Sequence, residues 1–203
     1  MFITFEGLDF SGKSTQARLL HEYLQGKKIR SVLLREPGGT KISEKIREIL
    51  LDKDNQEMIP LTEFLLFSSS RAQLVNQVIK PNLKKGIVVI CDRYYDSSEA
   101  YQGYGGKVDI KNIERVNEFA SGGLKPDISF LIDIKPAEAF KRTGSRGNIK
   151  DRMENKEHSF YNRVYKGFKE IAGKNRKRFV IIDGQKSIED IHTLIVSTVN
   201  KKI

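Results

Sequence analysis

The stretch Gly7-Leu8-Asp9-Phe10-Ser11-Gly12-Lys13-Ser14 decides the fold. It matches the pattern G-x-x-x-x-G-K-[ST], the P-loop that binds nucleotide phosphates through its backbone. A short apolar, β-prone segment (residues 2–5) precedes it, and apolar residues at helical spacing follow it over residues 15–24. The motif requires this order of strand, glycine loop and helix, so a glycine-rich turn that binds nothing is the weaker alternative.

The residue types in this loop each have a chemical use. Gly7 and Gly12 allow backbone conformations closed to other residues, so that N–H groups can approach phosphate oxygens. Lys13 supplies an ammonium group for the β and γ phosphates, and the Ser14 hydroxyl is suited to bind Mg²⁺. The motif therefore predicts a nucleotide-phosphate site, which consists of Gly7, Leu8, Asp9, Phe10, Ser11, Gly12, Lys13, Ser14 and Thr15.

The composition is that of a globular α/β protein. With 203 residues, 38% of them hydrophobic and 31% charged, the chain is expected to form one domain over residues 1–203. No apolar run approaches the roughly 18 residues of a membrane span, and we expect no signal peptide before the first strand. The only cysteine, Cys91, lies in an apolar run, which favours a buried thiol and a reducing, cytoplasmic location.

The net charge of +10 is compatible with nucleic acid, a membrane surface or small anionic substrates as partners. The basic residues do not form one amphipathic stripe, and the sequence has no aromatic and basic motif of the kind that recognises nucleic acid. We therefore expect small-molecule substrates, with neither nucleic acid nor a membrane as a partner.

Five apolar segments are predicted as strands, and helical segments separate them. The strands cover residues 2–5, 31–34, 87–91, 128–133 and 179–183, and the main helices 42–51, 61–83, 97–102, 110–121, 160–172 and 188–199. The long helix is expected to be disturbed near Pro81, and Pro136 to begin a further helix. This alternation predicts a three-layer α/β fold with a parallel sheet and right-handed crossovers.

Ligands of such folds bind at the carboxyl ends of the strands. Polar residues follow each predicted strand, and several of them should meet in one cleft beside the P-loop. They are Glu6, Asp9, Arg35, Glu36, Asp92, Arg93, Asp133 and Asp183.

Further motifs make the sequence more specific. They are Phe5-Glu6-Gly7-Leu8-Asp9, Arg35-Glu36-Pro37-Gly38-Gly39-Thr40, Phe67-x-x-x-Arg71, Asp92-Arg93-Tyr94, Ser97-Ser98-x-Ala100-Tyr101-Gln102-Gly103 and Lys125-Pro126-Asp127. In this order and spacing, the chain resembles the thymidylate kinase family of the bacterial type over essentially its whole length. The resemblance implies a P-loop NTPase fold and transfer of the ATP γ-phosphoryl group, with Mg²⁺, to dTMP, which gives dTDP for dTTP synthesis. It also implies a homodimer, formed through helices such as residues 61–83.

The resemblance assigns the charged residues to the phosphates and the sugar. Arg93 and Arg35 are expected to hold the acceptor phosphate with Arg47 behind them, although Arg47 could be a helix-surface charge. Asp9 is expected to meet the 3′-hydroxyl of the acceptor sugar. Asp92 is expected to orient Mg²⁺ together with Ser14, although an ion pair with Arg93 is an alternative.

The base site follows from the same resemblance. Phe67 is expected to stack on thymine, and Arg71 to donate a hydrogen bond to an exocyclic oxygen of the base. Core packing is the rival interpretation of Phe67. The other expected substrate contacts line the base, the sugar and the place of a 2′-hydroxyl, and they are Pro37, Ser98, Tyr101 and Gln102.

The family carries its extra catalytic arginine either in the P-loop or in a mobile lid. The variable P-loop positions hold no arginine, whereas Arg142, Arg146 and Arg152 lie in a segment with two glycines. The sequence therefore resembles the lid type, with a lid over residues 142–156. Arg146 and Arg152 are expected to act in catalysis with Lys13, Asp9 and Arg93, and Arg142 to lie against adenine. A disordered basic loop is the alternative for the lid, and Phe10 departs from the small residue that is commoner there.

Other P-loop proteins are the main rivals. A switch GTPase would carry an Asn-Lys-x-Asp guanine motif, which is absent. A deoxynucleoside kinase on the same scaffold is closer, but Arg93 and Arg35 provide two cations for an acceptor phosphate. The sequence thus favours a nucleoside monophosphate as the acceptor.

Overall fold

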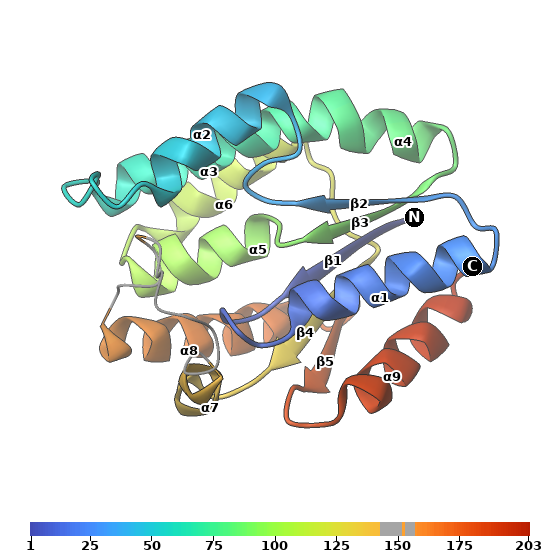
Figure 1. The fold of residues 1–203 in the computed structure, drawn as a ribbon. Helices are drawn as coiled ribbons and strands as arrows, with labels where there is room; N and C mark the ends of the chain where they lie inside the picture. The colour runs from blue at the N-terminus through green and yellow to red at the C-terminus, as the bar shows by residue number, and fades with distance from the viewer. Residues whose placement is uncertain (143–151, 153–156) are drawn as a thin grey trace.

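The computed structural model describes residues 1–142, 152 and 157–203, and a five-stranded parallel sheet forms its centre (Figure 1). The strands run close to the predicted ranges and are β1 (Phe2–Glu6), β2 (Ser31–Arg35), β3 (Val88–Asp92), β4 (Ile128–Asp133) and β5 (Phe179–Asp183). Their order in the sheet is β2-β3-β1-β4-β5, and every neighbouring pair is parallel. The predicted fold class is confirmed.

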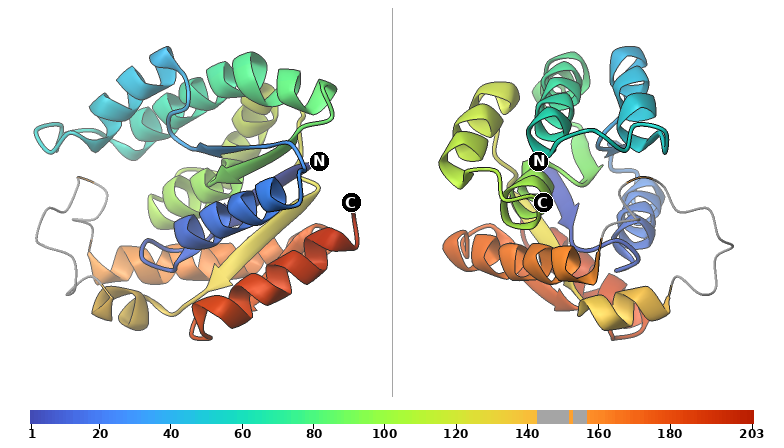
Figure 2. Two further views of the ribbon diagram at one scale, coloured as in Figure 1. Left: turned by 45° about the vertical axis from the view of Figure 1, so that its right-hand side comes forward. Right: turned by 90° about the vertical axis from the view of Figure 1, so that its left-hand side faces the viewer.

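Helices cover both faces of the sheet. On one face, α1 (Lys13–Gly26) and α9 (Ile188–Asn200) lie side by side (Figures 1 and 2). The opposite face is covered by the helix that follows β3 and by α8 (His158–Lys174), with α3 (Pro60–Leu74) and its continuation beside them. The remaining helices are α2 (Lys41–Leu51), which packs on α3, α6 (Ile110–Ser121) and α7 (Pro136–Lys141), which Pro136 begins as predicted.

Alternate residues of each central strand pack on opposite faces of the sheet. In β1, Ile3 and Phe5 join the core beneath α1 and α9, whereas Phe2 joins the core on the other face. In β3, Ile90 and Cys91 divide in the same way. Because both faces are covered, these strands are apolar at nearly every position before their carboxyl ends, as is typical of buried parallel strands.

The helix predicted over residues 61–83 changes its geometry in the turn before Pro81, as the sequence predicts. α3 passes into a π-helical segment, η1 (Val75–Ile79), and then into α4 (Lys80–Lys84). Proline has no N–H to donate to the preceding turn and its ring crowds that turn. A local widening of the helix before Pro81 accommodates both effects.

The helix after β3 is longer than the sequence predicts. It comprises α5 (Tyr95–Ser98) and the π-helical η2 (Glu99–Gly105), so it continues through Gly103, where we expected an interruption. A Cβ on Gly103 would lie 2.5 Å from Ile110, and one on Gly105 would lie 2.6 Å from Phe160. These glycines therefore allow close packing against α6 and α8 rather than ending the helix.

The cysteine and the hydrophobicity of the helices are the features that the composition singled out. Cys91 is fully buried in β3 as a free thiol, and burial raises its pKa well above the ordinary value. In the part of the chain that the structure describes, we find no helix with the length and apolar character needed to span a membrane.

Candidate active site

The P-loop joins β1 to α1 through a tight bend. Gly7 has a φ of 137°, and a Cβ there would lie 2.7 Å from the carbonyl oxygen of Ile132, so the position requires glycine. Gly12, with a φ of 96°, forms the N-cap of α1, whose first N–H groups face the loop. Phe10 also has a positive φ, 63°, which is uncommon for a residue with a side chain. The loop thus keeps the shape of an anion site in spite of Phe10.

A cavity of about 490 Å³ opens beside this loop, and both Lys13 and Arg142 line it. The Lys13 ammonium is buried and donates to the carbonyl oxygen of Leu8 at 3.2 Å. Burial lowers the pKa of Lys13, and the nearby charge of Arg93 lowers it further. Arg142 donates to the carbonyl oxygens of Ser11 (3.3 Å) and Gly184 (2.7 Å). Its guanidinium therefore links the P-loop to the loop that follows β5.

Oxygen atoms suited to Mg²⁺ lie at the β3 end of the P-loop. Ser14 and Asp92 line the same depression. The Oδ1 atom of Asp92 is buried and has no hydrogen-bond partner among the described residues. Arg93 forms its ion pair with Asp9 rather than with Asp92, so the alternative interpretation of Asp92 is not supported. A free carboxylate oxygen beside a hydroxyl fits a hard cation that keeps water and phosphate oxygens as its other ligands.

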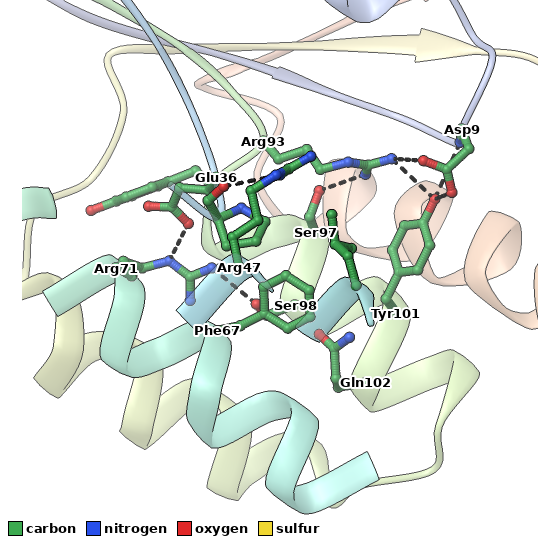
Figure 3. Close-up of a pocket in the computed structure, with 13 residues that line it drawn as sticks. Asp9, Glu36, Arg47, Phe67, Arg71, Arg93, Ser97, Ser98, Tyr101 and Gln102 are labelled. Carbon is green, nitrogen blue, oxygen red and sulfur yellow. Dashed lines mark hydrogen bonds and ion pairs between the residues drawn. The ribbon is translucent and has the colours of Figure 1, made fainter. Parts of the chain in front are cut away.

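A second cavity lies on the other side of Asp9, which lines both cavities (Figure 3). Its walls come from the P-loop, the segment after β2, helices α2 and α3, and the helix after β3. Asp9 and Tyr101 lie at one end and Arg71 at the other, with Phe67 between them (Figure 3). This arrangement separates a charged end near the P-loop from an end enclosed by a ring and hydrogen-bonding groups.

Three side chains approach the Asp9 carboxylate at the charged end. Arg93 donates from Nη2 to Asp9 Oδ1 at 2.5 Å, and the Tyr101 hydroxyl donates to Asp9 Oδ2 at 2.8 Å. Lys13 Nζ lies 3.9 Å from the same carboxylate. Burial alone would raise the pKa of Asp9, but the charges of Arg93 and Lys13 outweigh it and lower the pKa. Asp9 is therefore held as a carboxylate between two cations.

The segment after β3 holds Arg93 in a strained backbone conformation. Its φ is 71°, in the left-handed region, while its N–H donates to the carbonyl oxygen of Phe5 at 2.9 Å. The guanidinium also donates from Nη1 to the Gly7 carbonyl oxygen (3.1 Å) and to Ser97 Oγ (3.0 Å). Backbone strain of this kind gathers at functional sites. The arginine is thus fixed before any ligand arrives.

Glu6 supports this segment from beneath. Its Oε1 accepts the N–H of Tyr94 at 2.9 Å, and its Oε2 lies 2.6 Å from Ser97 Oγ. Burial, and then the charge of Asp96, raise the pKa of Glu6 to about 8. Glu6 is therefore mostly protonated at neutral pH, and it does not cancel the positive charge of Arg93.

Arg71 forms the other end of the cavity. It is only 1% exposed, and its Nε donates to Glu36 Oε2 at 2.8 Å. Its Nη1 donates to Asn117 Oδ1 (2.8 Å) and its Nη2 to Ser98 Oγ (2.9 Å). Three of its five N–H groups are thus engaged, and the guanidinium faces the cavity in a fixed orientation.

The comparisons with known proteins agree with this geometry. The family model for thymidylate kinase matches residues 5–195. The chain belongs to the thymidylate kinase family. Similar relatives are the thymidylate kinase of Exiguobacterium sp., 49% identical over 94% of this chain and 90% of the relative, and that of Caldanaerobacter subterraneus, 45% identical over 98% and 95%. The crystal structure of thymidylate kinase from Ehrlichia chaffeensis is also similar, with a TM-score of 0.80, 38% identity and 98% of each chain covered.

Most residues expected to contact substrate in a thymidylate kinase lie together here. The second cavity is lined by Asp9, Pro37, Arg47, Phe67, Arg71, Arg93, Ser98, Tyr101 and Gln102. Phe67 is half-buried at the cavity wall rather than packed wholly into the core. Arg47 lines the cavity and donates to the carbonyl oxygen of Pro37 at 3.0 Å, so the interpretation as a helix-surface charge is wrong.

Arg35 is the exception, because the structure does not place it in this cavity. It forms an ion pair with Glu44 at 2.9 Å, and its side chain is 55% exposed. It lines the depression beside Ser14 and Asp92 instead. Arg35 and Arg93 therefore do not lie together here, because Glu44 of α2 holds the Arg35 guanidinium outside the cavity, and the role of Arg35 at the acceptor phosphate stays a prediction.

One of the residues expected in the lid, Arg152, also lies away from the P-loop. Arg152 is buried, donates to the carbonyl oxygen of Leu50 at 2.8 Å, and pairs with Glu63 at 2.6 Å. It is not among the residues that line the P-loop cavity, so its expected role in catalysis stays a prediction that these contacts do not support. Arg146 and the rest of the predicted lid lie outside the described residues.

Glu6, Ser97 and Glu63 support the site, although the sequence only placed Glu6 in the cleft and Ser97 in a motif and predicted no contact for any of the three. Glu63 accepts from Gln102 Nε2 at 2.8 Å and so fixes a side chain of the cavity wall. The signal for Glu6 was present, because an acid that directly follows four apolar or β-prone residues of a strand is expected to be buried.

Proposed function

We propose that the protein transfers the γ-phosphoryl group of ATP to dTMP and so produces ADP and dTDP. The observation that carries the proposal is the shared position of Asp9. Lys13 of the P-loop and Arg93 of the second cavity contact this one carboxylate, at 3.9 and 2.5 Å. Two cations thus flank the place where a phosphoryl group would pass between the two cavities.

The chemistry requires little covalent work from the protein, since alignment and charge neutralisation lower the barrier of phosphoryl transfer. Lys13 and the P-loop N–H groups are suited to the donor phosphates. Arg93 and Arg47 are suited to the acceptor phosphate, because a guanidinium can bind a phosphate through two parallel hydrogen bonds. Arg142 is proposed to lie against the adenine.

The acceptor sugar and base would occupy the rest of the second cavity. Asp9 is placed to accept from the sugar 3′-hydroxyl, and the Tyr101 ring restricts space for a 2′-hydroxyl. Phe67 offers a ring for stacking, and Arg71 offers fixed donors to a thymine oxygen.

Mg²⁺ fits the oxygen atoms of Ser14 and Asp92 described above. When bound with ATP, it would neutralise charge on the β and γ phosphates. Ser14 and Asp92 would hold the cation near the carboxyl end of β3.

A substrate screen tests the proposed function. The protein is incubated with ATP, Mg²⁺ and one nucleoside monophosphate at a time, and ADP release is measured. dTMP should give the highest kcat/KM, with dUMP second, and thymidine without a phosphate should be inactive. Turnover of thymidine, or a clear preference for another monophosphate, would contradict the proposal.

We also propose a homodimer in the cytoplasm. Large apolar side chains are exposed on α3 and α6, which pack together: Leu61 is 49%, Leu65 46% and Phe119 90% exposed. Contact with a second copy would remove this apolar surface from water. Light scattering after size exclusion should give twice the chain mass, and Leu65→Glu should reduce it to one chain mass. The free thiol of Cys91 suits a reducing compartment.

A further inference from the structure

A third cavity, of about 250 Å³, lies behind the acceptor cavity, between α6 and the helix formed by α5 and η2. Asn117 separates the two. Its Oδ1 accepts from Arg71 on the acceptor side, and its Nδ2 donates to the carbonyl oxygen of Tyr95 at 3.3 Å. The proposed function gives this third cavity no role.

Carboxylates dominate its lining. Glu99 of η2 meets Glu114 and Glu118 of α6 around the cavity. Two cations also line it, but the Arg178 guanidinium already holds both oxygens of Asp96, at 2.8 and 2.7 Å. Among the described lining residues, Lys125 is then the remaining positive charge, and the three glutamates carry three negative charges. The lining therefore has an excess of negative charge.

Glu99 is the residue that points to a ligand. It is only 8% exposed, yet it has neither a hydrogen bond nor an ion pair within the described part of the chain. Its oxygens are not among the polar atoms sealed in the core, so the carboxylate is accessible from the cavity that Glu99 lines, where a positively charged donor can pair with it. The other two glutamates of the lining, Glu114 and Glu118 on α6, are exposed at the rim of the cavity and would add to its attraction for a cation.

The chemistry of the lining restricts the class of ligand. An anion such as a nucleotide phosphate would face three carboxylates. Nowhere in residues 1–142, 152 and 157–203 do three histidine, cysteine, aspartate or glutamate side chains gather closely enough to hold a metal ion. Asn117 and Asn175 offer amide oxygens, and carboxylates accept directional hydrogen bonds from N–H groups. We propose that this cavity binds a small organic cation with an ammonium or guanidinium group, anchored by Glu99.

The titration of Glu99 makes the proposal more specific. Burial, and then the charges of Asp96 and Glu114, raise its pKa to about 7, although Lys174 and Arg178 oppose the shift. A cation binds the ionised carboxylate, whose fraction rises about tenfold between pH 6 and pH 8. The affinity for the cation should therefore rise by about the same factor over this range.

Isothermal titration calorimetry with agmatine, which carries a guanidinium and an ammonium, tests the site at constant ionic strength. We expect saturable binding at one site per chain that tightens from pH 6 to pH 8. Glu99→Gln should weaken it at least tenfold, the size of one charge-assisted hydrogen bond. Glu189→Gln, on exposed α9, removes the same charge elsewhere and should leave binding unchanged.

Several results would overturn the proposal. They are the absence of saturable binding, equal binding by tetramethylammonium, which has no N–H donor, and equal affinity in Glu99→Gln. General attraction to the surface is not expected from a chain with a net charge of +10. If Glu99→Gln does not fold, the double variant Glu114→Gln/Glu118→Gln, at exposed positions, carries the test, and unchanged affinity there counts against the site.

Discussion

Replacing Glu6 by glutamine should change how the stability of the protein depends on pH. Glu6 is fully buried beneath the Arg93 segment, where it contacts the Tyr94 N–H and the Ser97 hydroxyl. Glutamine has the same shape and no charge, and its amide oxygen can still accept a hydrogen bond from the Tyr94 N–H or from the Ser97 hydroxyl, both of which donate to Glu6. The variant therefore imitates the protonated form at every pH.

The magnitude follows from the raised pKa. Burial and Asp96 raise the pKa of Glu6 from 4.5 to about 8 in the folded protein. Above pH 4.5 the unfolded chain releases a proton that the folded protein keeps, so stability from this group is complete below pH 4.5. It is lost as the pH rises to about 8. Each pH unit in this window costs the folded state about 1.4 kcal/mol, so the loss between pH 5 and pH 8 is up to about 4 kcal/mol.

Urea denaturation of wild type and Glu6→Gln at pH 5, 6, 7 and 8 measures this effect. Subtracting the wild-type free energy of unfolding from that of the variant cancels the contributions of the groups that do not interact with Glu6. The difference should increase steadily with pH in favour of the variant. A difference that stays constant from pH 5 to pH 8 would refute the reasoning, because Glu6 would then titrate alike in both states.

Three further outcomes are expected. Lys13→Ala should lower kcat by about 10²–10³ while the fold is kept, because it removes a preorganised contact to the transferring phosphate. Single-turnover kinetics measures the rate and circular dichroism measures the fold, and a near wild-type kcat would exclude the P-loop assignment. Arg71→Gln should shrink the ratio of kcat/KM for dTMP over dCMP about tenfold, since the amide can also accept from cytosine; an unchanged ratio in steady-state kinetics would remove Arg71 from base recognition. Arg152→Met leaves Glu63 buried without its cation, so the free energy of unfolding should fall by about 3–5 kcal/mol in urea denaturation; a loss of turnover without a loss of stability would restore the catalytic interpretation.

The sequence predicts the framework of this fold because its signals are local. Each buried strand is a short apolar run, and the P-loop requires a strand before it and a helix after it. The disturbance near Pro81 was also predictable, since proline lacks the N–H that a helix needs. The continuation of the helix beyond Gln102 was not predictable, because Gly103 and Gly105 pack against side chains of α6 and α8 that are distant in sequence.

The arginines show where prediction from sequence ends. The motif places Arg35 next to the acceptor cavity, but the side-chain direction depends on Glu44, which also accepts from the Gly39 N–H at 2.7 Å. Arg152 was expected to act with Arg146, yet a buried acid on α3 holds it elsewhere. Motif position gives the element on which a charged side chain lies, whereas its partner is decided by tertiary packing.

The left-handed backbone of Arg93 has a consequence for engineering this enzyme. An arginine at a φ of 71° costs about 1 kcal/mol relative to a glycine, which adopts that conformation without strain. Glycine at this position would relieve that strain, but it would also leave Asp9 without the cation that pairs with it and would remove the hydrogen bonds to Gly7 and Ser97. Breaking such a partly buried ion pair costs more than the strain, so the guanidinium stabilises the fold in spite of its backbone. A screen for heat resistance should therefore retain Arg93, so that the residue proposed to bind the acceptor phosphate is preserved by selection for stability as well.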